Sequence, residues 1–132
     1  MKILRIDSSV RIQNSKTRMT VDIRNGGSFD VTGGLMDIQN DAELIIDGDG
    51  DALSTLNVKS FNFGQRSKVD VLAGGGLFVE GDVDYRGNNS SINVEGFFRT
   101  SGSILITGGS GNQLNADGNA EVMIEQNLDV RG

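Results

Sequence analysis

Three aspartates alternate with glycine in one short stretch of the chain, at Asp47, Asp49 and Asp51. Carboxylates at alternating positions let a single turn direct several oxygen ligands at one Ca²⁺ ion. These three residues are therefore a candidate calcium site. The alternative interpretation is an acidic corner between two strands, in which the carboxylates are simply solvated.

The same stretch resembles the beginning of an EF-hand calcium loop, whose first three ligand positions match the three aspartates. It departs from that loop at Ala52, where the invariant glycine would stand, and at Val58, where the bidentate glutamate would stand. Apart from calcium at this place, we expect no cofactor.

Other chemistry would have to rest on carboxylates, because the chain has no histidine and no cysteine. Histidine is the commonest general base, and imidazole and thiolate groups are the usual ligands of zinc. Glu80 and Asp82 could act as acid and base, as carboxylate pairs do in glycan-cleaving enzymes. A solvated strand face explains the same pair. We therefore predict that the protein is not an enzyme, with a carbohydrate-active β-helix enzyme as the remote alternative.

Composition and charge narrow the choice of partners. The 132 residues are expected to form one domain, 1-132, with a net charge of -6. Affinity for phosphate groups needs clustered positive charge, so we expect neither nucleic acid nor membrane insertion. No apolar run approaches the roughly 18 residues of a membrane span, and residues 1–13 lack the pattern of a secretory signal. Localisation stays open between a cell surface or virion for a fibre segment and the cytoplasm for a scaffold.

Pairs of apolar residues separated by one residue recur along the chain, each followed by glycine, asparagine, serine or aspartate. This pattern is typical of short half-buried strands joined by turns. Every third pair falls into a series with a step of roughly 22 to 25 residues, in the range of solenoid repeats. The first series is Val21-Ile23, Leu44-Ile46, Val69-Val71, Ile92-Val94 and Leu114-Ala116, and the second is Met36-Ile38, Phe61-Phe63, Val83-Tyr85, Ile104-Ile106 and Leu128-Val130.

The fold that this period predicts is all-β: a single-stranded parallel β-helix, or solenoid, with about three short strands per coil and about five coils. Corners are expected between the pairs, for example at Thr32-Gly33-Gly34. An antiparallel β-sandwich or jelly roll is the alternative. Stacked corner asparagines are expected to form hydrogen-bonded amide ladders. The candidates are Asn25, Asn40, Asn57, Asn88, Asn89, Asn112, Asn115 and Asn119.

Three segments resemble the glycine-punctuated coils of known β-solenoid proteins: GGLFVEGDV at 75–83, SSINVEGFF at 90–98 and QNLDVRG at 126–132. They are similar to haemagglutinin-like adhesins and, more loosely, to bactofilins, which are cytoskeletal polymers. The resemblance implies a structural protein, a segment of a fibre or adhesin of the cell-surface or phage-tail type that presents flat acidic faces for binding. A bactofilin-like intracellular scaffold is the alternative.

The two ends of such a solenoid predict self-association, because strand edges that nothing covers can pair with another chain. Apolar alternation reaches Ile3-Leu4-Arg5-Ile6 at one end and Leu128-Asp129-Val130 at the other, and the chain has no proline. We therefore expect the protein to bind itself, as a homo-oligomer or an end-to-end polymer, and a receptor or glycan in addition. Phe97, Phe98 and Tyr85 could provide a contact patch, with one of the two phenylalanines in the core.

Overall fold

The structure of the chain is a computed structural model that describes residues 3–5, 10–13, 19–23, 26–39, 41–48, 53–106 and 109–130. Every regular element in these residues is a β-strand, and none of them forms a helix that could span a membrane. The first six strands are β1 (Ile3–Arg5), β2 (Val10–Gln13), β3 (Met19–Ile23), β4 (Ser28–Gln39), β5 (Ala42–Ile46) and β6 (Ser54–Phe63). The others are β7 (Lys68–Val71), β8 (Gly75–Val79), β9 (Val83–Tyr85), β10 (Ser91–Val94), β11 (Phe97–Thr100), β12 (Ile104–Ile106), β13 (Gln113–Ala116), β14 (Glu121–Ile124) and β15 (Leu128–Val130).

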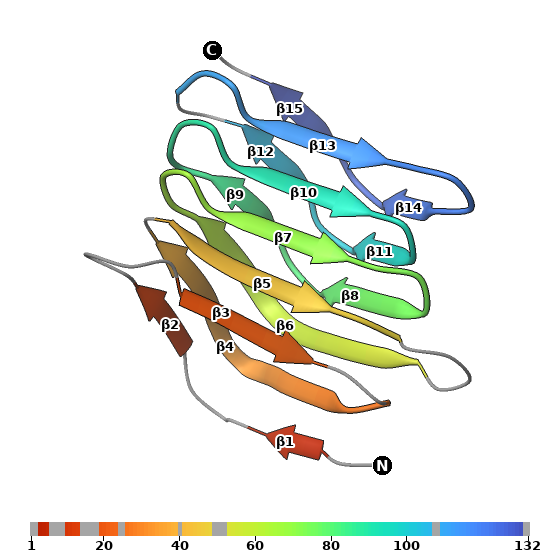
Figure 1. Ribbon diagram of the computed structural model, residues 1–132. Coiled ribbons are helices and arrows are strands. Elements are labelled where there is room, and N and C mark those ends of the chain that lie inside the picture. Colours follow the sequence, from red (N-terminus) through yellow and green to blue (C-terminus); the bar gives the residue numbers. More distant parts are fainter. Residues whose placement is uncertain are drawn as a thin grey trace.

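The chain winds through two sheets (Figure 1). β3, β5, β7, β10 and β13 form a five-stranded sheet, and the other strands form a ten-stranded sheet. The larger sheet has two facets. The first facet holds β1, β8, β11, β14 and the first halves of β4 and β6, and the second holds β2, β9, β12, β15 and the second halves.

Every pairing between the described strands is parallel. Each coil passes through the five-stranded sheet, then the first facet, then the second facet, so the five strands from β3 to β13 correspond to four full turns. The molecule is a single-stranded parallel β-helix, as the sequence predicts. The antiparallel sandwich and the jelly roll are excluded, because both need antiparallel pairs.

Both predicted series of apolar pairs are confirmed as columns of the solenoid. In the five-stranded sheet Leu44, Val69, Ile92 and Leu114 lie opposite one another in register, and on the second facet Phe61, Val83, Ile104 and Leu128 do the same. Alternate residues of a strand face the same side, so the two residues of each apolar pair both point inward. Stacking these columns gives a core that is dry through the central coils, where the inward side chains are fully buried.

One predicted corner, Thr32-Gly33-Gly34, does not interrupt a strand. β4 continues through these residues as a strand, and its pairing with β6 shifts in register between Val31 and Leu35. The change of direction between the two facets is therefore taken up by an irregularity within a strand, as β-bulges do elsewhere. Two coils later the strand does end at the same change of direction, because β8 ends at Val79 and β9 begins at Val83.

Aromatic side chains fill the core behind the second facet. The rings of Phe61 and Phe63 have centroids 4.7 Å apart, and Tyr85 stacks on Phe63 at 5.0 Å. Tyr85 is fully buried, and its hydroxyl donates to the carbonyl oxygen of Gln113 at 3.0 Å. Burial raises the pKa of Tyr85 above its ordinary value. The expectation that Tyr85 contributes to a surface patch is therefore wrong.

Candidate functional site

Of the three predicted calcium ligands, the structure describes only Asp47, which follows β5. Its backbone N–H donates to the carbonyl oxygen of Ile23 at 2.9 Å and so extends the ladder between β3 and β5. Asp49 and Asp51 lie outside the described residues. Within the described residues, no three side chains of the metal-binding types come together. The calcium site stays a prediction.

Gly48 shows why glycine occurs in this acidic stretch. A Cβ atom at this position would lie 1.9 Å from the carbonyl carbon of Gly74, which belongs to the turn of the next coil. Such an approach is far inside van der Waals contact, so only glycine fits. This glycine is explained by the stacking of two turns.

The carboxylates of Glu80 and Asp82 have different surroundings. Asp82 accepts a hydrogen bond from the backbone N–H of Ser103 at 2.8 Å, and so joins two successive turns of the ten-stranded sheet. Glu80 is exposed on the outer surface after β8. The structure therefore gives Asp82 a role in holding the turns together.

An amide ladder runs along the outer face of the five-stranded sheet, on the strands themselves and not at the corners where the sequence predicted it. Asn115 donates from Nδ2 to Oδ1 of Asn93 at 2.8 Å, and Asn93 donates to Oδ1 of Asp70 at 2.9 Å. Sequence reasoning missed Asn93, although the period of 22 residues that separates it from Asn115 would have found it. Among the predicted residues, Asn25 and Asn40 lie outside the described residues.

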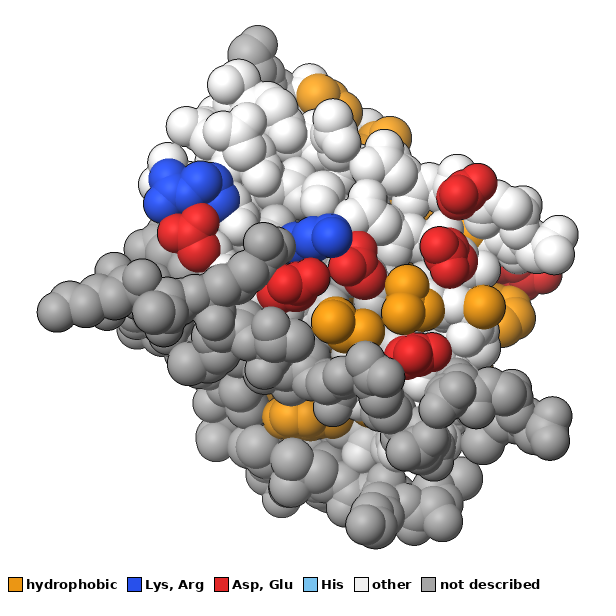
Figure 2. All heavy atoms as spheres, in the orientation of Figure 1, with side chains coloured by type: hydrophobic (Ala, Val, Ile, Leu, Met, Phe, Trp, Pro, Cys, Tyr) orange, Lys and Arg blue, Asp and Glu red, His pale blue; other side chains and the backbone are white. Residues whose placement is uncertain are grey.

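This outer face carries both signs of charge. Lys68 lies between two acidic side chains, with its Nζ 3.1 Å from Asp70 and 3.9 Å from Glu43. Figure 2 shows acidic and basic side chains next to one another there. The described part of the face therefore carries charges of both signs beside apolar side chains, and the predicted flat acidic face is less one-sided than the net charge suggests.

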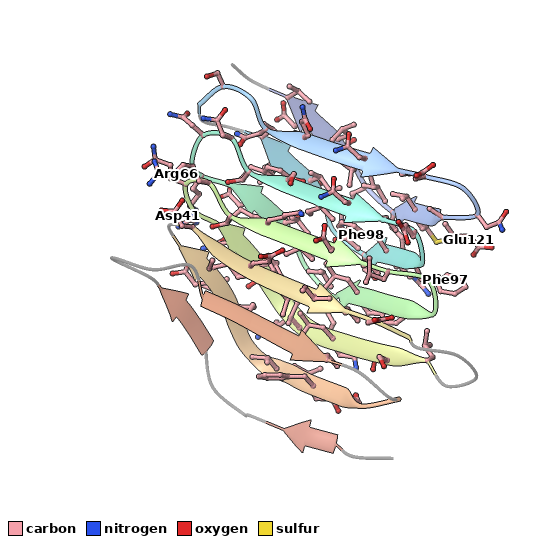
Figure 3. The ribbon with its side chains drawn as sticks, in the orientation of Figure 1. Asp41, Arg66, Phe97, Phe98 and Glu121 are labelled. Atoms are coloured by element: carbon pink, nitrogen blue, oxygen red, sulfur yellow. The ribbon has the colours of Figure 1, made fainter. Side chains whose placement is uncertain are left out.

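The corners before β5, β7, β10 and β13 repeat one backbone conformation. Asp41, Arg66, Asn89 and Gly111 stand there in successive coils, each with a positive φ between 53° and 73°. The guanidinium of Arg66 donates to both carboxylate oxygens of Asp41, at 2.7 and 2.9 Å (Figure 3), which holds the pKa of Arg66 above its ordinary value. The pair is exposed, so it positions the corner more than it stabilises the fold.

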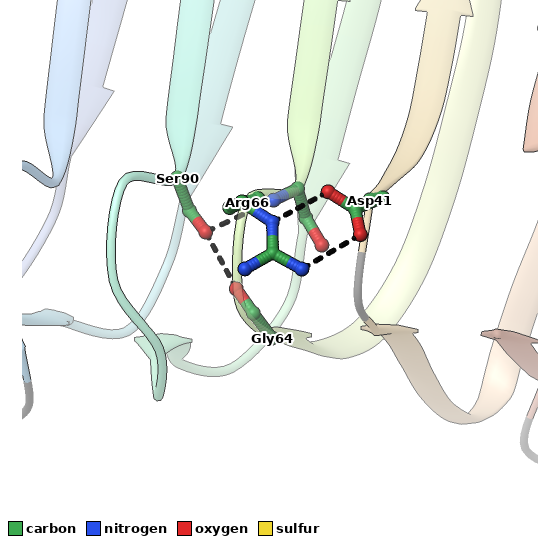
Figure 4. A network of polar contacts seen from close by, with 5 residues as sticks. Asp41, Gly64, Arg66 and Ser90 are labelled. Carbon is green, nitrogen blue, oxygen red and sulfur yellow. Dashed lines mark hydrogen bonds and ion pairs between the residues drawn. The ribbon is translucent and has the colours of Figure 1, made fainter. Parts of the chain in front are cut away.

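Beside this pair, Ser90 links three segments (Figure 4). Its hydroxyl accepts the backbone N–H of Ser67 at 3.1 Å and donates to the carbonyl oxygen of Gly64. The N–H of Ser90 in turn donates to Oδ1 of Asn112 in the following coil, at 2.9 Å. Side chains at this corner thus satisfy the backbone of the coil before them.

The coil formed by β13, β14 and β15, which we call the end coil, differs from the other described coils in exposure. Its inward positions continue the buried columns, since Phe98 pairs with Val122 and Ile104 pairs with Leu128. Phe98 and Ile104 are buried, whereas 37% of Val122 and 55% of Leu128 is exposed. Leu128 and its neighbours on the end coil are core side chains that no further coil covers in the described structure.

The same coil also presents open strand edges. β14 and β15 end the two facets of the ten-stranded sheet, and β13 ends the five-stranded sheet. The outer N–H and C=O groups of such strands can pair with another parallel strand. Residues 109–130 form no helix over these edges (Figure 1).

The two phenylalanines on β11 separate as expected. Phe98 points into the core and is buried, and Phe97 lies on the outside with 41% of its surface exposed (Figure 3). The exposed apolar surface nearest to the end coil therefore includes Phe97 and Met123, in addition to the inward columns.

Comparison with known proteins gives no relative of this chain. No protein-family model matches it, and neither a curated protein nor a solved structure is significantly similar to it. The fold is established by the structure, and the function has to be inferred from the chain's own residues.

Proposed function

We propose that the chain is a non-enzymatic structural protein, a β-solenoid segment of a fibre or adhesin that binds copies of itself end to end. The observation that carries this proposal is the end coil, which combines exposed inward columns with three open strand edges. An added coil would bury apolar side chains and satisfy backbone groups at once. The same contact would serve a bactofilin-like intracellular scaffold.

The partner that fits this surface is the opposite end of a second copy. At that end β1, β2 and β3 begin the two sheets and pair in parallel with β4 and β5, and no other strand of the described residues pairs with their outer edges. Two parallel edges of equal strand spacing can continue one ladder, here β1 on β14 and β2 on β15, whereas a loop or helix could not.

Charge favours this head-to-tail arrangement. Residues 1–24 contain six Lys and Arg against two Asp, and residues 109–132 contain four Asp and Glu against one Arg. One end of the sequence is therefore basic and the other acidic, and complementary charge steers the two ends together. Two acidic ends would repel each other instead.

The experiment compares two variants of equal exposure. Leu128 and Met123 are both 55% exposed on the end coil, but Leu128 lies in an inward column and Met123 in an outward one, opposite Arg99. We expect the wild-type protein and Met123→Lys to form chains, seen by sedimentation velocity and negative-stain electron microscopy, and Leu128→Lys to remain monomeric. A lysine on the Leu128 column would place a charge between two coils, where it has no counter-ion.

Raised salt concentration is the second arm, because screening weakens attraction between the charged ends. We expect chains to form more slowly at high salt. A wild-type protein that stays monomeric at its highest soluble concentration, or a Leu128→Lys variant that assembles like Met123→Lys, would refute the proposed contact.

A further inference from the structure

A groove of about 760 Å³ lies on the outer surface of the ten-stranded sheet, where the first facet turns toward the second. Four successive coils line it. One column of its lining consists of Asp30 on β4, Asn57 on β6, Phe78 on β8 and Arg99 on β11, which lie opposite one another in register. Three steps between parallel strands span about 14 Å, so the groove runs along the solenoid axis for the length of an extended chain molecule.

The wall of the groove contains one flat apolar surface, the ring of Phe78. A Cβ atom on Gly76 would lie 2.7 Å from Cε2 and 3.1 Å from Cζ of this ring. The ring therefore lies across β8 over Gly76, and the missing side chain is what makes room for it. A half-buried aromatic ring fixed against a sheet is a platform on which a flat ligand face can pack.

Polar groups surround this platform, and several of them have no partner among the described residues. Within the described residues, no hydrogen bond or ion pair joins the side chains of Thr32, Glu80 or Ser101 to another group. Thr32, Glu80 and Ser101 follow Asp30, Phe78 and Arg99 by two residues, and all three line the same groove. Two hydroxyls and a carboxylate offer both donors and acceptors to a ligand.

The charges of the groove select against ionic ligands. Asp30 and Glu80 repel an anion, and Arg99 opposes a cation although it is paired with Glu125 through Nε and Oε1 at 2.9 Å. Asp30 already accepts a hydrogen bond from Asn57 at 2.6 Å. A small set of placed polar groups around an apolar surface is typical of ligand sites of this volume.

We propose that the groove binds a neutral oligosaccharide chain lying along the solenoid axis. One sugar ring packs its CH face on Phe78, and Thr32, Glu80 and Ser101 form hydrogen bonds with the sugar hydroxyls. The inference deepens the proposed function by naming the ligand class and the site on the side of the solenoid. It rests on the fibre or adhesin role and does not need the contact at the end coil.

The test uses four neutral tetrasaccharides, namely cellotetraose, maltotetraose, chitotetraose and mannotetraose, together with pentalysine as a cationic peptide. Binding is measured by calorimetry and by NMR chemical-shift changes on the Leu128→Lys variant. We expect saturable binding of at least one tetrasaccharide, with shifts at β8 and β11. Phe78→Ala and Glu80→Gln should each weaken binding about tenfold.

Phe97→Ala and Glu95→Gln are the matched controls, because both residues are exposed and neither lines the groove. We expect both controls to bind like the parent protein. The proposal is overturned if none of the tetrasaccharides binds, if Phe78→Ala and Glu80→Gln bind normally while folded, or if only pentalysine binds. Assembly tests the end-to-end contact, and saccharide binding tests the groove. Measuring both on the wild type and on the Leu128→Lys variant therefore distinguishes the failure of one proposal from the failure of the other.

Discussion

Two serines that occupy the same corner position in successive coils should respond differently to replacement by alanine. The hydroxyl of Ser90 joins the backbone N–H of Ser67 to the carbonyl oxygen of Gly64 (Figure 4). The hydroxyl of Ser67 is also buried but has no hydrogen-bond partner among the described residues. One side chain satisfies two backbone groups, and the other satisfies none.

The magnitudes follow from what each substitution leaves behind. Ser90→Ala leaves the N–H of Ser67 and the carbonyl of Gly64 without this partner, and an unsatisfied buried group costs about 1–3 kcal/mol. We expect Ser90→Ala to lower the free energy of unfolding by about 2–4 kcal/mol. Ser67→Ala removes a buried hydroxyl that is itself unpaired, so stability should be unchanged or higher by about 1 kcal/mol. For a chain of this length, 1 kcal/mol corresponds to a change in Tm of about 3–5 °C.

The assay is urea unfolding followed by circular dichroism, with both substitutions made in the Leu128→Lys background. A monomeric background is needed because self-association would add a concentration-dependent term to the stability. Equal m-values would show that the same surface is exposed on unfolding in both variants. The reasoning about this corner is refuted if Ser67→Ala is as destabilising as Ser90→Ala, since the Ser67 hydroxyl would then have a partner of equal worth.

Two further predictions concern the core and the repeat. Tyr85 is the only tyrosine, and burial raises its pKa. Its phenolate absorbance should therefore appear on alkaline titration only as the protein unfolds. Because the pKa of Tyr85 in the folded state lies above the unfolded value of about 10, the stability of the protein falls as the pH rises above 10. Phenolate absorbance at pH 10 without loss of the β-sheet dichroism signal would contradict the buried position. Deleting residues 91–112 removes one period and joins Ser90 to Gln113, so β13 should stack on β7 in register and give a folded but less stable β-protein. Deleting residues 91–101 removes only half a period and should abolish cooperative thermal unfolding; equal folding of the two deletions would show that the coils are not interchangeable units.

The inward columns were predictable from the sequence because burial imposes one constraint on every coil. Val69, Ile92 and Leu114 occupy one position of successive coils, and all three must be apolar for the core to stay dry. The same constraint made the second series of apolar pairs, which forms the second facet, visible in the sequence. Periodic burial therefore gave the fold class, the strands per coil and the register.

The first facet was harder to recognise as a series, because one inward position is polar. Thr100 follows Val58 and Val79 in an inward column, and its hydroxyl donates to the carbonyl oxygen of Gly81 at 2.6 Å. A buried hydroxyl with a backbone partner is tolerated in a core, but it interrupts an apolar pattern. A hydrogen bond to a neighbouring turn cannot be seen in a pattern of residue types.

The groove could not have been predicted, because outward positions obey no common constraint. Asp30, Asn57, Phe78 and Arg99 share a column but no chemical property, and their sequence spacing varies between 21 and 27 residues. What brings them together is the turn between the two facets, which the sequence suggested only as a break at Thr32-Gly33-Gly34. Register and curvature, which follow from the whole fold, decide which outward side chains meet.

The two sheets do not begin at the same level of the solenoid. β1 and β2 start the ten-stranded sheet one coil before β3 starts the five-stranded sheet, whereas β13, β14 and β15 end together. A second molecule that placed its β1 on β14 and its β2 on β15 would bring its β3 to rest one strand short of β13. Each joint of such a fibre would then have a slit on one side, bordered by two parallel edges and wide enough for a single extended peptide. A fibre built this way could be decorated at regular intervals by any partner that offers one free strand.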